Sequence, residues 1–249
     1  MASIIDPTVD WDATIGISGY GRLVRLGIFT DVHADYEALV RVLRALEALA
    51  ADSLVCLGDL VVHGQRPNEV VDLVRSLAIP TVGGNHDHGA VYYGSDPRLV
   101  FFNPKSELHT ALTQPRLSDA NRTYLAQLPE RFHPVPDVCC VHACYRDRYG
   151  LLYSDTILAQ LHADAPVPVT LSGHTHRTRI HVRQEDGSLV DIDPWESGAE
   201  RVTYELDWER ERYILNCGNT SQLLYDRLPA VCGLLDTKAR TITWQRVYE

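Results

Sequence analysis

Apolar and polar positions alternate in blocks over the first 90 residues of this chain. Residues 22–30 and 53–58 are short apolar runs that predict buried strands, and an aspartate follows each run directly. Apolar residues recur with helical spacing over 35–50, which predicts a helix between these two strands. A second helix is predicted from Pro67, since proline suits the first turn of a helix, and a third strand over 79–83.

The β-α-β-α-β order of this half predicts where its polar groups gather. Connections of this kind make the strands parallel, and open α/β sheets bind ligands beyond the carboxyl ends of their strands. Asp31, Asp59 and Asn85 all follow predicted strands. The loop 83–89, GGNHDHG, should therefore face a cleft that it shares with the loops after the first two strands.

Strands dominate the predicted second half of the chain. Apolar runs over 138–142 and 167–173 each lead into histidines, and residues 177–192 have the pattern of a β-hairpin around the turn EDGS. Residues 90–134 are less regular, and we expect them to be partly helical and to cover one side of the cleft, with Ser118 capping one helix. A second sheet packed on the first and flanked by helices would accommodate these strands.

One α/β domain is expected to span residues 1–249, with residues 1–20 as an N-terminal extension, because no repeat, linker or low-complexity tract interrupts the chain. The hydrophobic share of 45% and the charged share of 22% are ordinary for a globular protein. A net charge of −10 makes nucleic acid an unlikely main partner, since surfaces that bind nucleic acid are basic. Nothing in the sequence sets an oligomeric state.

The sequence is typical of a cytoplasmic protein that has no membrane partner. Its N-terminus lacks the basic region of a signal peptide, and no apolar run reaches the length of a membrane span. The cysteines form no CxxC pair, so we expect reduced, buried small hydrophobic residues. They are Cys56, Cys139, Cys140, Cys144, Cys217 and Cys232. A redox or metal role for Cys140 and Cys144, which bracket His142, is the alternative.

Five polar motifs, each at the end of an apolar run, carry the candidate chemistry. They are Asp31-Val-His33, Gly58-Asp59, Gly84-Asn85-His86-Asp87, His142 and Gly173-His174-Thr175-His176. Taken singly, each has an ordinary explanation: Asp31 as a helix cap, Asp59 as a turn residue, His142 as a core histidine. Taken together and in this order, the five motifs favour one shared cleft.

The residues of these motifs form a mixed nitrogen and oxygen ligand set. The set comprises Asp31, His33, Asp59, Asn85, His142, His174 and His176. It suits Mn, Fe or Zn better than Ca, which prefers oxygen alone, and without thiolates it is unlike a closed structural zinc site. Seven ligands are too many for one ion with an open position, but one carboxylate can bridge two ions about 3.5–4 Å apart.

The charge of such a site favours phosphate esters as substrates. Two divalent ions bring four positive charges, of which Asp31 and Asp59 neutralise only two. Two metals can clamp both the attacking and the leaving oxygen of a phosphoryl group, and a metal brings the pKa of bound water to around 7 in the case of zinc. The sequence contains no nucleophile elbow of the G-x-S-x-G type.

The five motifs resemble, in order, those of the calcineurin-like metallophosphoesterase superfamily: D-x-H, G-D, G-N-H-D/E, H and G-H-x-H over residues 31–176. The segment 216–222, NCGNTSQ, is similar to an Asn-Pro-Gly-Ser stretch of its small prokaryotic phosphodiesterases and phosphatases, with Cys217 in place of the usual proline. The resemblance implies a four-layer α/β/β/α sandwich of two mixed sheets.

The resemblance also implies roles for the motif residues. The ligands of the first metal would be Asp31, His33, Asp59 and His176. The ligands of the second would be Asp59, Asn85, His142 and His174. A hydroxide bridging the metals would attack phosphorus in line, and His86 would lie over the substrate as the catalytic residue that helps to protonate the leaving oxygen.

Two departures from relatives limit what the resemblance says about the substrate. Residues 58–64 read GDLVVHG, so Val62 and His63 replace the Asp and Arg of the protein Ser/Thr phosphatase block G-D-x-V-D-R-G. After His142 the chain reads Ala-Cys-Tyr-Arg146 where small members often have Gly-Ser-Pro. His63 and Arg146 are therefore candidate substrate-binding residues, with a turn cap and a solvated loop as the respective alternatives.

The remaining histidines and the tryptophans are assigned no chemistry. We expect His88 to be at the surface or behind the site, and a further group at the surface: His109, His133, His162 and His181. The tryptophans are expected to serve packing, since no basic patch accompanies them; they are Trp11, Trp195, Trp208 and Trp244.

The sequence thus predicts a dimetal phosphoesterase that hydrolyses a small phosphodiester or phosphomonoester. The alternatives are a nuclease or nucleotide pyrophosphohydrolase, and a non-catalytic metal-binding scaffold of the same fold.

Overall fold

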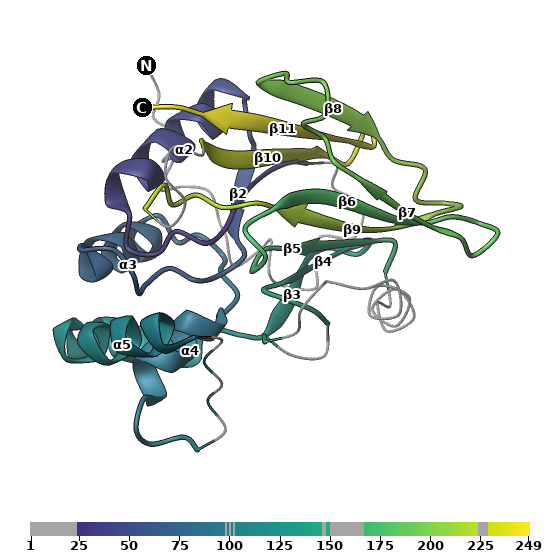
Figure 1. Cartoon of the computed structure of the whole chain (residues 1–249). Coiled ribbons are helices and arrows are strands. Elements are labelled where there is room, and N and C mark those ends of the chain that lie inside the picture. Colours follow the sequence, from purple (N-terminus) through teal and green to yellow (C-terminus); the bar gives the residue numbers. More distant parts are fainter. Residues whose placement is uncertain are drawn as a thin grey trace.

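The computed structural model describes residues 24–97, 99, 101, 103–145, 148–149, 167–223 and 229–249. Two mixed β-sheets pack against each other in it (Figure 1). The five-stranded sheet contains β1 (Arg25–Phe29), β2 (Ser53–Cys56), β8 (Arg201–Glu205), β10 (Ala230–Asp236) and β11 (Thr241–Val247). Its strand order is β2-β1-β10-β11-β8, and only β1 and β2 run parallel.

The six-stranded sheet has the order β3-β4-β5-β9-β6-β7. Its strands are β3 (Arg131–Val135), β4 (Val138–Val141), β5 (Val169–Ser172), β6 (Thr178–Arg183), β7 (Leu189–Ile192) and β9 (Arg212–Cys217). Strands β4, β5 and β9 run parallel, and β6 and β7 form the predicted hairpin, with Ile180 opposite Ile192. The predicted α/β fold with two mixed sheets is confirmed.

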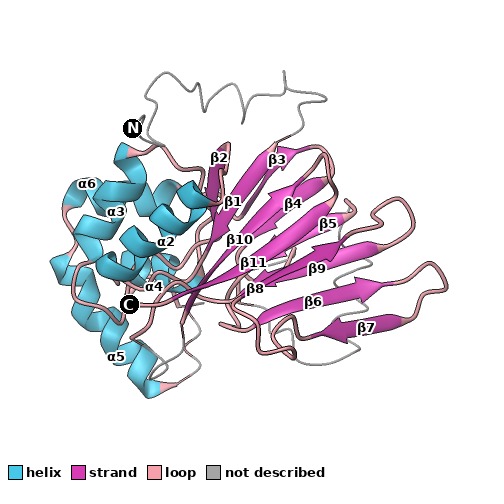
Figure 2. Cartoon of the chain, turned by 90° about the horizontal axis from the view of Figure 1, so that it is seen from above, coloured by secondary structure: helices cyan, strands magenta, loops and turns pink. Residues whose placement is uncertain are grey.

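The helices of the described residues gather to one side of the strands (Figure 2). They are α2 (Tyr36–Ala48), α3 (Pro67–Ser76), α4 (Asn85–Tyr92), α5 (Pro104–Thr113) and α6 (Asp119–Gln127), with a 3₁₀ turn, η1 (Gln114–Arg116). Helix α2 packs on β10, β11 and β1 of the five-stranded sheet. No helix in the described ranges combines the length and apolar character needed to cross a membrane.

Local sequence explains where the predicted helices begin. Asp35 precedes α2, and its carboxylate accepts a hydrogen bond from the backbone N–H of Ala38 at 3.1 Å. Pro67 opens α3, as predicted. Ser118 caps α6, as predicted, because its hydroxyl accepts from the N–H of Asn121 at 3.2 Å.

The alternation of side chains along β1 divides the interior into two cores. Phe29 contributes to the core between the helices and the five-stranded sheet, whereas Leu26 and Ile28 lie between the two sheets. Trp244 of β11 is completely buried in the core between the sheets. The predicted packing role of this tryptophan is therefore confirmed, and burial of apolar surface on both faces of the sheet holds β1 in place.

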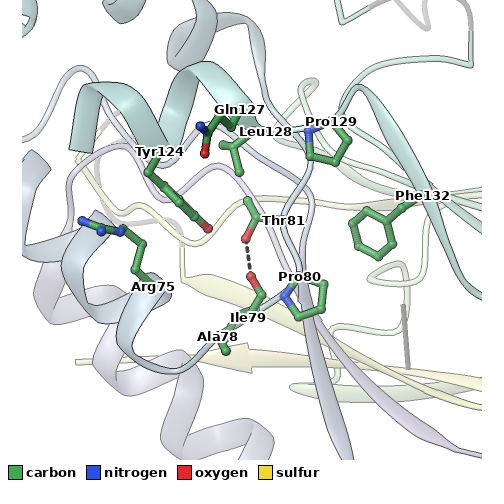
Figure 3. A pocket seen from close by; sticks show the side chains of 10 residues that line it. All are labelled: Arg75, Ala78, Ile79, Pro80, Thr81, Tyr124, Gln127, Leu128, Pro129 and Phe132. Carbon is green, nitrogen blue, oxygen red and sulfur yellow. Dashed lines mark hydrogen bonds between the residues drawn. The ribbon is translucent and has the colours of Figure 1, made fainter. Parts of the chain in front are cut away.

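Residues 79–83 were predicted to be a strand, but they do not form a regular strand. The segment runs beside β2 with a single bridge, between Cys56 and Thr81. Pro80 has no N–H to donate to a ladder, and the Thr81 hydroxyl instead donates to the carbonyl of Ile79 at 2.8 Å. The segment borders a surface pocket of about 500 Å³, which Tyr124 of α6 also lines (Figure 3).

Candidate metal centre

The ends of four strands from both sheets meet at one edge of the molecule. Asp31 follows β1, Asp59 follows β2, His142 follows β4, and His174 follows β5. Backbone hydrogen bonds join neighbouring ends, from Asp31 N to Gly58 O at 3.0 Å and from Gly173 N to His142 O at 2.8 Å. The polar residues that were expected beyond the ends of parallel strands thus come from two sheets.

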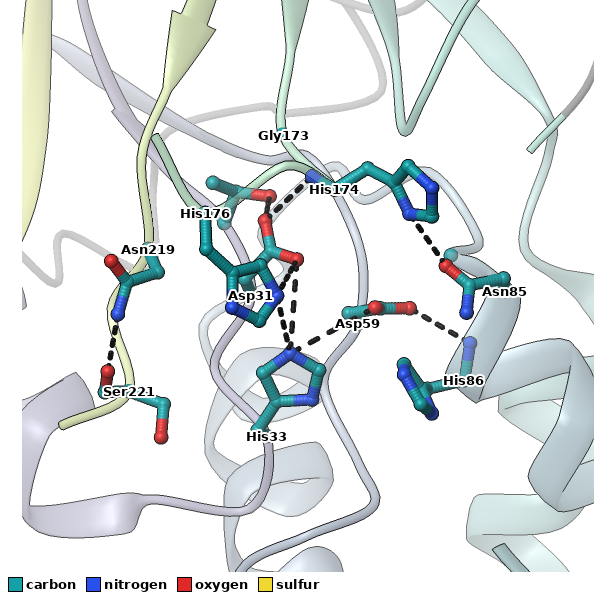
Figure 4. A network of polar contacts seen from close by, with 12 residues as sticks. Asp31, His33, Asp59, Asn85, His86, Gly173, His174, His176, Asn219 and Ser221 are labelled. Carbon is teal, nitrogen blue, oxygen red and sulfur yellow. Dashed lines mark hydrogen bonds and ion pairs between the residues drawn. The ribbon is translucent and has the colours of Figure 1, made fainter. Parts of the chain in front are cut away.

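A first group of metal-type donors contains Asp31, His33 and His176 (Figure 4). One donor atom from each lies within 4.8 Å of the others. His176 Nε2 is 3.0 Å from Asp31 Oδ1 and 3.1 Å from His33 Nε2. Two imidazole nitrogens that face each other at this distance repel through their lone pairs unless a proton or a cation lies between them, so the geometry suits a cation.

A second group contains Asp59, His142 and His174, again with donor atoms within 4.8 Å of one another. The amide oxygen of Asn85 adds to it, at 3.1 Å from His142 Nε2 and 2.9 Å from His174 Nδ1. Nitrogen and oxygen donors without thiolate are the ligands that Mn, Fe and Zn accept. Both groups therefore fit the cations that the ligand set predicted.

Asp59 lies between the two groups. Its Oδ2 is 3.3 Å from His142 Nε2 of the second group and 3.9 Å from His33 Nε2 of the first. Its other oxygen, Oδ1, accepts a hydrogen bond from the backbone N–H of His86 at 2.9 Å. A carboxylate held in this way presents one fixed oxygen to both groups.

The backbone at the candidate donors is unusual. Left-handed φ angles between 50° and 67° occur at Asp31, His33, Asp59, His174 and His176. Non-glycine residues adopt this region rarely, although Asp and His are enriched in it, and such conformations persist only where the surroundings hold them. Five of the seven candidate donors are strained in this way, as are Ala34, Val62 and His63 beside them in the sequence.

The segment 216–222 supplies part of what holds these turns. Thr220 N donates to Thr30 O at 2.8 Å, and Ser221 N donates to Asp31 O at 3.0 Å. The side chain of Asn216 donates to the carbonyl of Gly173 at 2.6 Å. The NCGNTSQ stretch thus supports both the β1 and the β5 turns from its own backbone and amide groups.

Backbone carbonyls orient two of the histidines. His142 Nδ1 lies 2.7 Å from Leu57 O, and His33 Nδ1 lies 3.4 Å from Val61 O. A carbonyl can only accept, so it favours a proton on Nδ1 and leaves Nε2 to face inward as a ligand nitrogen. Histidines that bind metals usually donate their other ring N–H to a carbonyl or a similar acceptor.

Close approach of backbone to carboxylates explains two glycines of the motifs. A Cβ at Gly84 would lie 2.0 Å from Asp59 Oδ1, and a Cβ at Gly173 would lie 2.5 Å from Asp31 Oδ2. Both distances are shorter than any real Cβ contact. These glycines are thus required because a side chain has no room beside the two carboxylates.

The GGNHDHG stretch is the start of a helix, not the loop that the sequence predicted. Helix α4 begins at Asn85 with Gly84 as its N-cap. Asp87 stands in its first turn and accepts hydrogen bonds from four backbone N–H groups, those of Asp59, Leu60, Val61 and Gly84, at 2.8–3.2 Å. Asp87 therefore fastens the helix to the turn after β2.

Burial and the two carboxylates set the charges of the site. Burial raises the pKa of Asp31, but contacts with His176 and His33 hold it well below its usual range. Burial lowers the pKa of His142, yet the adjacent Asp59 carboxylate outweighs this and raises it to about 9. Burial lowers the pKa of His86 to about 3, so this ring is neutral at pH 7 and offers one N–H.

His63 and His109 form a contact that the sequence analysis missed. Their Nδ1 atoms are 2.8 Å apart, and the ring of His63 also lies 4.8 Å from that of His86, between ring centres. His109, which was expected at the surface, is half-buried on α5, in the irregular 90–134 segment. Only the fold brings it next to the motif histidines, 46 residues away from His63.

The other histidines divide between surface and interior. His88 Nδ1 lies 2.8 Å from the hydroxyl of Tyr149, away from the carboxylates of the site. His133 is exposed, as expected, whereas His181 is buried on β6, beside Asp191 at 3.2 Å. His162 and the candidate substrate-binding residue Arg146 lie outside the described residues, as do residues 1–20.

The cysteines are free and all but Cys144 are buried, in agreement with the expected hydrophobic role. Burial raises the pKa of the Cys139 thiol to about 11, which keeps it protonated and unreactive at pH 7. Neither candidate donor group contains a cysteine.

Comparison with known proteins agrees with the arrangement of these motifs. Residues 24–178 match the sequence model of the family described as calcineurin-like phosphoesterase. The chain belongs to the calcineurin-like phosphoesterase family. The family resemblance of the five motifs is thereby confirmed.

Solved structures show how far this phosphoesterase fold extends along the chain. A metallophosphoesterase from Sphaerobacter thermophilus is 30% identical, with a TM-score of 0.73 over 91% of this chain and 89% of that one. The hypothetical protein PH1004 from Pyrococcus horikoshii shares the fold at 14% identity, with a TM-score of 0.69 and the same coverage.

Two curated relatives match over shorter stretches. The uncharacterized protein MJ0912 of Methanocaldococcus jannaschii is 34% identical over 42% of this chain and 42% of its own length. The uncharacterized metallophosphoesterase YkuE of Bacillus subtilis is 28% identical over 62% of this chain and 58% of its own. The match thus spans less than two thirds of either relative.

Proposed function

We propose that this phosphoesterase-family chain hydrolyses small phosphodiesters or phosphomonoesters with the help of two divalent transition-metal ions. Asp31, His33 and His176 would hold one ion, and the second would be held by Asn85, His142 and His174. Asp59 would bind both ions. Mn, Fe and Zn all suit this donor set.

The position of Asp59 carries the proposal. Its Oδ2 lies within 4 Å of a histidine nitrogen from each donor group, which is what a carboxylate shared by two ions requires. Two divalent ions at these groups would polarise the phosphoryl oxygens and activate water as the nucleophile. The side chains of the site would hold the ions in place and orient the ester between them.

Hydrolysis of a chromogenic phosphodiester, bis(4-nitrophenyl) phosphate, tests this function. Protein loaded with Mn, Fe or Zn is expected to hydrolyse it, and protein treated with a chelator is expected to lose that activity. Elemental analysis of the same samples should find two ions per chain. Activity that persists in metal-free protein, or the absence of turnover with every metal, would contradict the proposal.

His86 is proposed to donate its N–H toward the leaving oxygen. Its ring is neutral and close to Asp59, whose carboxylate accepts the backbone N–H of the same residue. We expect His86→Ala to lower kcat by about 10²–10³-fold for an alkyl phosphate ester, as for the loss of one hydrogen bond to a developing oxyanion. The loss should be much smaller for a 4-nitrophenyl ester, because 4-nitrophenolate leaves without protonation.

The leaving-group comparison separates hydrogen-bond donation to the leaving oxygen from structural damage. A variant that had merely disturbed the metal ions would lose activity equally with both esters, and its metal content would fall. Metal content should therefore remain at the wild-type value in His86→Ala. Equal losses with the two leaving groups would contradict the proposal that His86 donates a hydrogen bond to the leaving oxygen.

His63 is proposed to contact the bound phosphate, and His109 to fix the orientation of its ring. The Nδ1–Nδ1 contact of 2.8 Å places the proton of this pair between the two rings, which leaves His63 Nε2 to face away from His109. We expect His109→Ala to raise KM about fivefold to tenfold, the equivalent of roughly one hydrogen bond, with kcat little changed.

Steady-state kinetics on matched variants checks this role. His133→Ala removes an exposed histidine from β3 and should leave KM unchanged. His109→Asn, which can still donate a hydrogen bond, should recover part of the affinity. A fall in kcat with unchanged KM for His109→Ala would contradict the positioning role.

A protein Ser/Thr phosphatase activity is not part of the proposal. Val62, which replaces the Asp of the phosphatase block, is completely buried in the core between the helices and the sheet. Burial lowers the pKa of His63, in place of the Arg, to about 2, so this ring is neutral and cannot grip a phosphate by charge.

A further inference from the structure

A second pocket adjoins the candidate metal centre at His176. It has a volume of about 260 Å³ and lies where β6 meets the paired ends of β10 and β11. The lining residues that matter here are His176, Arg177, Arg179, Trp195, Asn219 and Arg246. Figure 4 shows Asn219 and His86 on opposite sides of Asp31 and Asp59. The pocket therefore lies on the side of the centre away from His86.

The pocket is positively charged although the chain as a whole carries −10. Three arginines line it, against one carboxylate, that of Asp193. Asp193 is engaged with Arg179, at 3.1 Å between Oδ2 and the guanidinium. Arg177 and Arg246 have no ion pair with any described residue, so their charges are available to a ligand.

The side chains that line the pocket are held in place by contacts with one another. The guanidinium carbon of Arg246 lies 4.4 Å from the ring centre of Trp195, a cation–π arrangement. The backbone N–H of Trp195 donates to Asp193 Oδ1 at 2.9 Å, so one carboxylate ties together the tryptophan and Arg179. A stacked guanidinium keeps its N–H edges free and suits the oxygens of a phosphate or carboxylate.

We infer that this pocket binds a second anionic group, phosphate or carboxylate, on the alcohol part of the substrate. The inference rests on the proposed phosphoesterase function, since the metal centre must hold the scissile phosphate. A substrate with its scissile phosphate beside His176 would place its leaving group toward His86. Its other alcohol would extend toward Arg177 and Arg246. The preferred substrates are therefore phosphate esters with two separate anionic groups.

The sequence analysis missed this basic pocket because its residues are far apart along the chain. Arg177 belongs to the basic stretch 177–183, but Trp195 and Arg246 follow it only after 18 and then a further 51 positions. Trp195 was expected to serve packing for that reason. The pairing of Arg246 with Val231 across β10 and β11 brings it to the β6 side of the molecule.

A set of matched 4-nitrophenyl phosphodiesters tests the inference. Their second alcohol ends in a carboxylate, a phosphate, a methyl group or a trimethylammonium group. With Mn-loaded protein, kcat/KM for the better anionic diester should exceed that for the neutral one by at least about tenfold, as for one charge-assisted hydrogen bond. The cationic diester should be the poorest. The larger of the two anionic effects identifies the group that the pocket prefers.

Variants of the pocket arginines test whether the preference for an anionic diester arises in this pocket. Arg246→Gln should reduce the preference for the anionic diester about tenfold, while kcat/KM for the neutral diester changes less than about twofold. Arg177→Gln, whose exposed side chain makes little contribution to folding, provides a second variant should Arg246→Gln not fold. Arg183→Gln, at the exposed end of β6 outside the pocket, should retain the full preference.

Binding measurements separate failure of this inference from failure of the proposed function. If no diester is hydrolysed, the phosphoesterase function fails, and calorimetric titration of the same four diesters then examines the pocket alone. Tighter binding of an anionic diester that is lost in Arg246→Gln supports the pocket. Equal or undetectable binding of all four, or equal effects of Arg246→Gln on every diester, overturns it.

Discussion

Asp59→Asn is expected to lower kcat/KM for phosphoester hydrolysis by more than about 10³-fold, since shared metal ions supply several kcal/mol of transition-state stabilisation. The substitution replaces the oxygen that faces both donor groups, or its partner, with an NH₂ group that cannot bind a cation. It also removes one negative charge from between His33 and His142. Elemental analysis should find less than one ion per chain.

Asp72→Asn is the matched control, because Asp72 is an exposed carboxylate on α3 far from the donor groups. It should retain wild-type metal content and activity. Asp59→Asn protein that still bound two ions and turned over at near the wild-type rate would show that Asp59 is not shared between metals.

Asp87→Ala is expected to destabilise the protein by at least about 3 kcal/mol. The change leaves four backbone N–H groups without their acceptor in a buried position, and each hydrogen bond to a charged group contributes about 1.5–3 kcal/mol. For a chain of this length, Tm should fall by roughly 6–12 °C. Thermal unfolding in the presence of a chelator measures the effect without a contribution from metal binding.

Asp87→Asn supplies the comparison for this prediction. Its amide keeps one oxygen to accept hydrogen bonds but turns an NH₂ group toward the remaining donors, so we expect an intermediate fall in Tm. A shift of less than about 2 °C for Asp87→Ala would mean that water replaces the carboxylate, and that Asp87 does not fasten α4 to the turn after β2.

Much of the fold could be predicted from local pattern. Residues that favour a helix start mark three helices: Asp35 and Ser118 cap α2 and α6, and Pro67 opens α3. The sequence EDGS marks the turn of the β6–β7 hairpin. The strand order could not be predicted, because the pairing of β1 with β10 depends on contacts about 200 residues apart. The prediction of a strand over 79–83 was wrong because Pro80 has no N–H for the ladder of hydrogen bonds. A pattern of hydrophobic residues alone does not show this.

The candidate donors were predictable because their residue types and their places after strands are both visible in the sequence. The contacts that hold these donors in place were not predictable. Asp87 belongs to one of the five motifs, but the sequence does not reveal that it accepts four hydrogen bonds from two different segments. His109 and Arg246 have ordinary sequence surroundings, and only tertiary structure places them beside His63 and Trp195.

The pairing of β1 with β10 bears on how this protein forms during synthesis. β1 lies between β2 and β10, and the turn that follows it is held by Thr220 and Ser221. Residues 24–178, which contain the five polar motifs, are synthesised before β10 and the segment 216–222. A nascent chain of that length would hold its histidines and carboxylates on an incomplete sheet. We therefore expect the candidate donors to reach their final arrangement only after β10 has paired with β1 and residues 216–222 have packed against its turn.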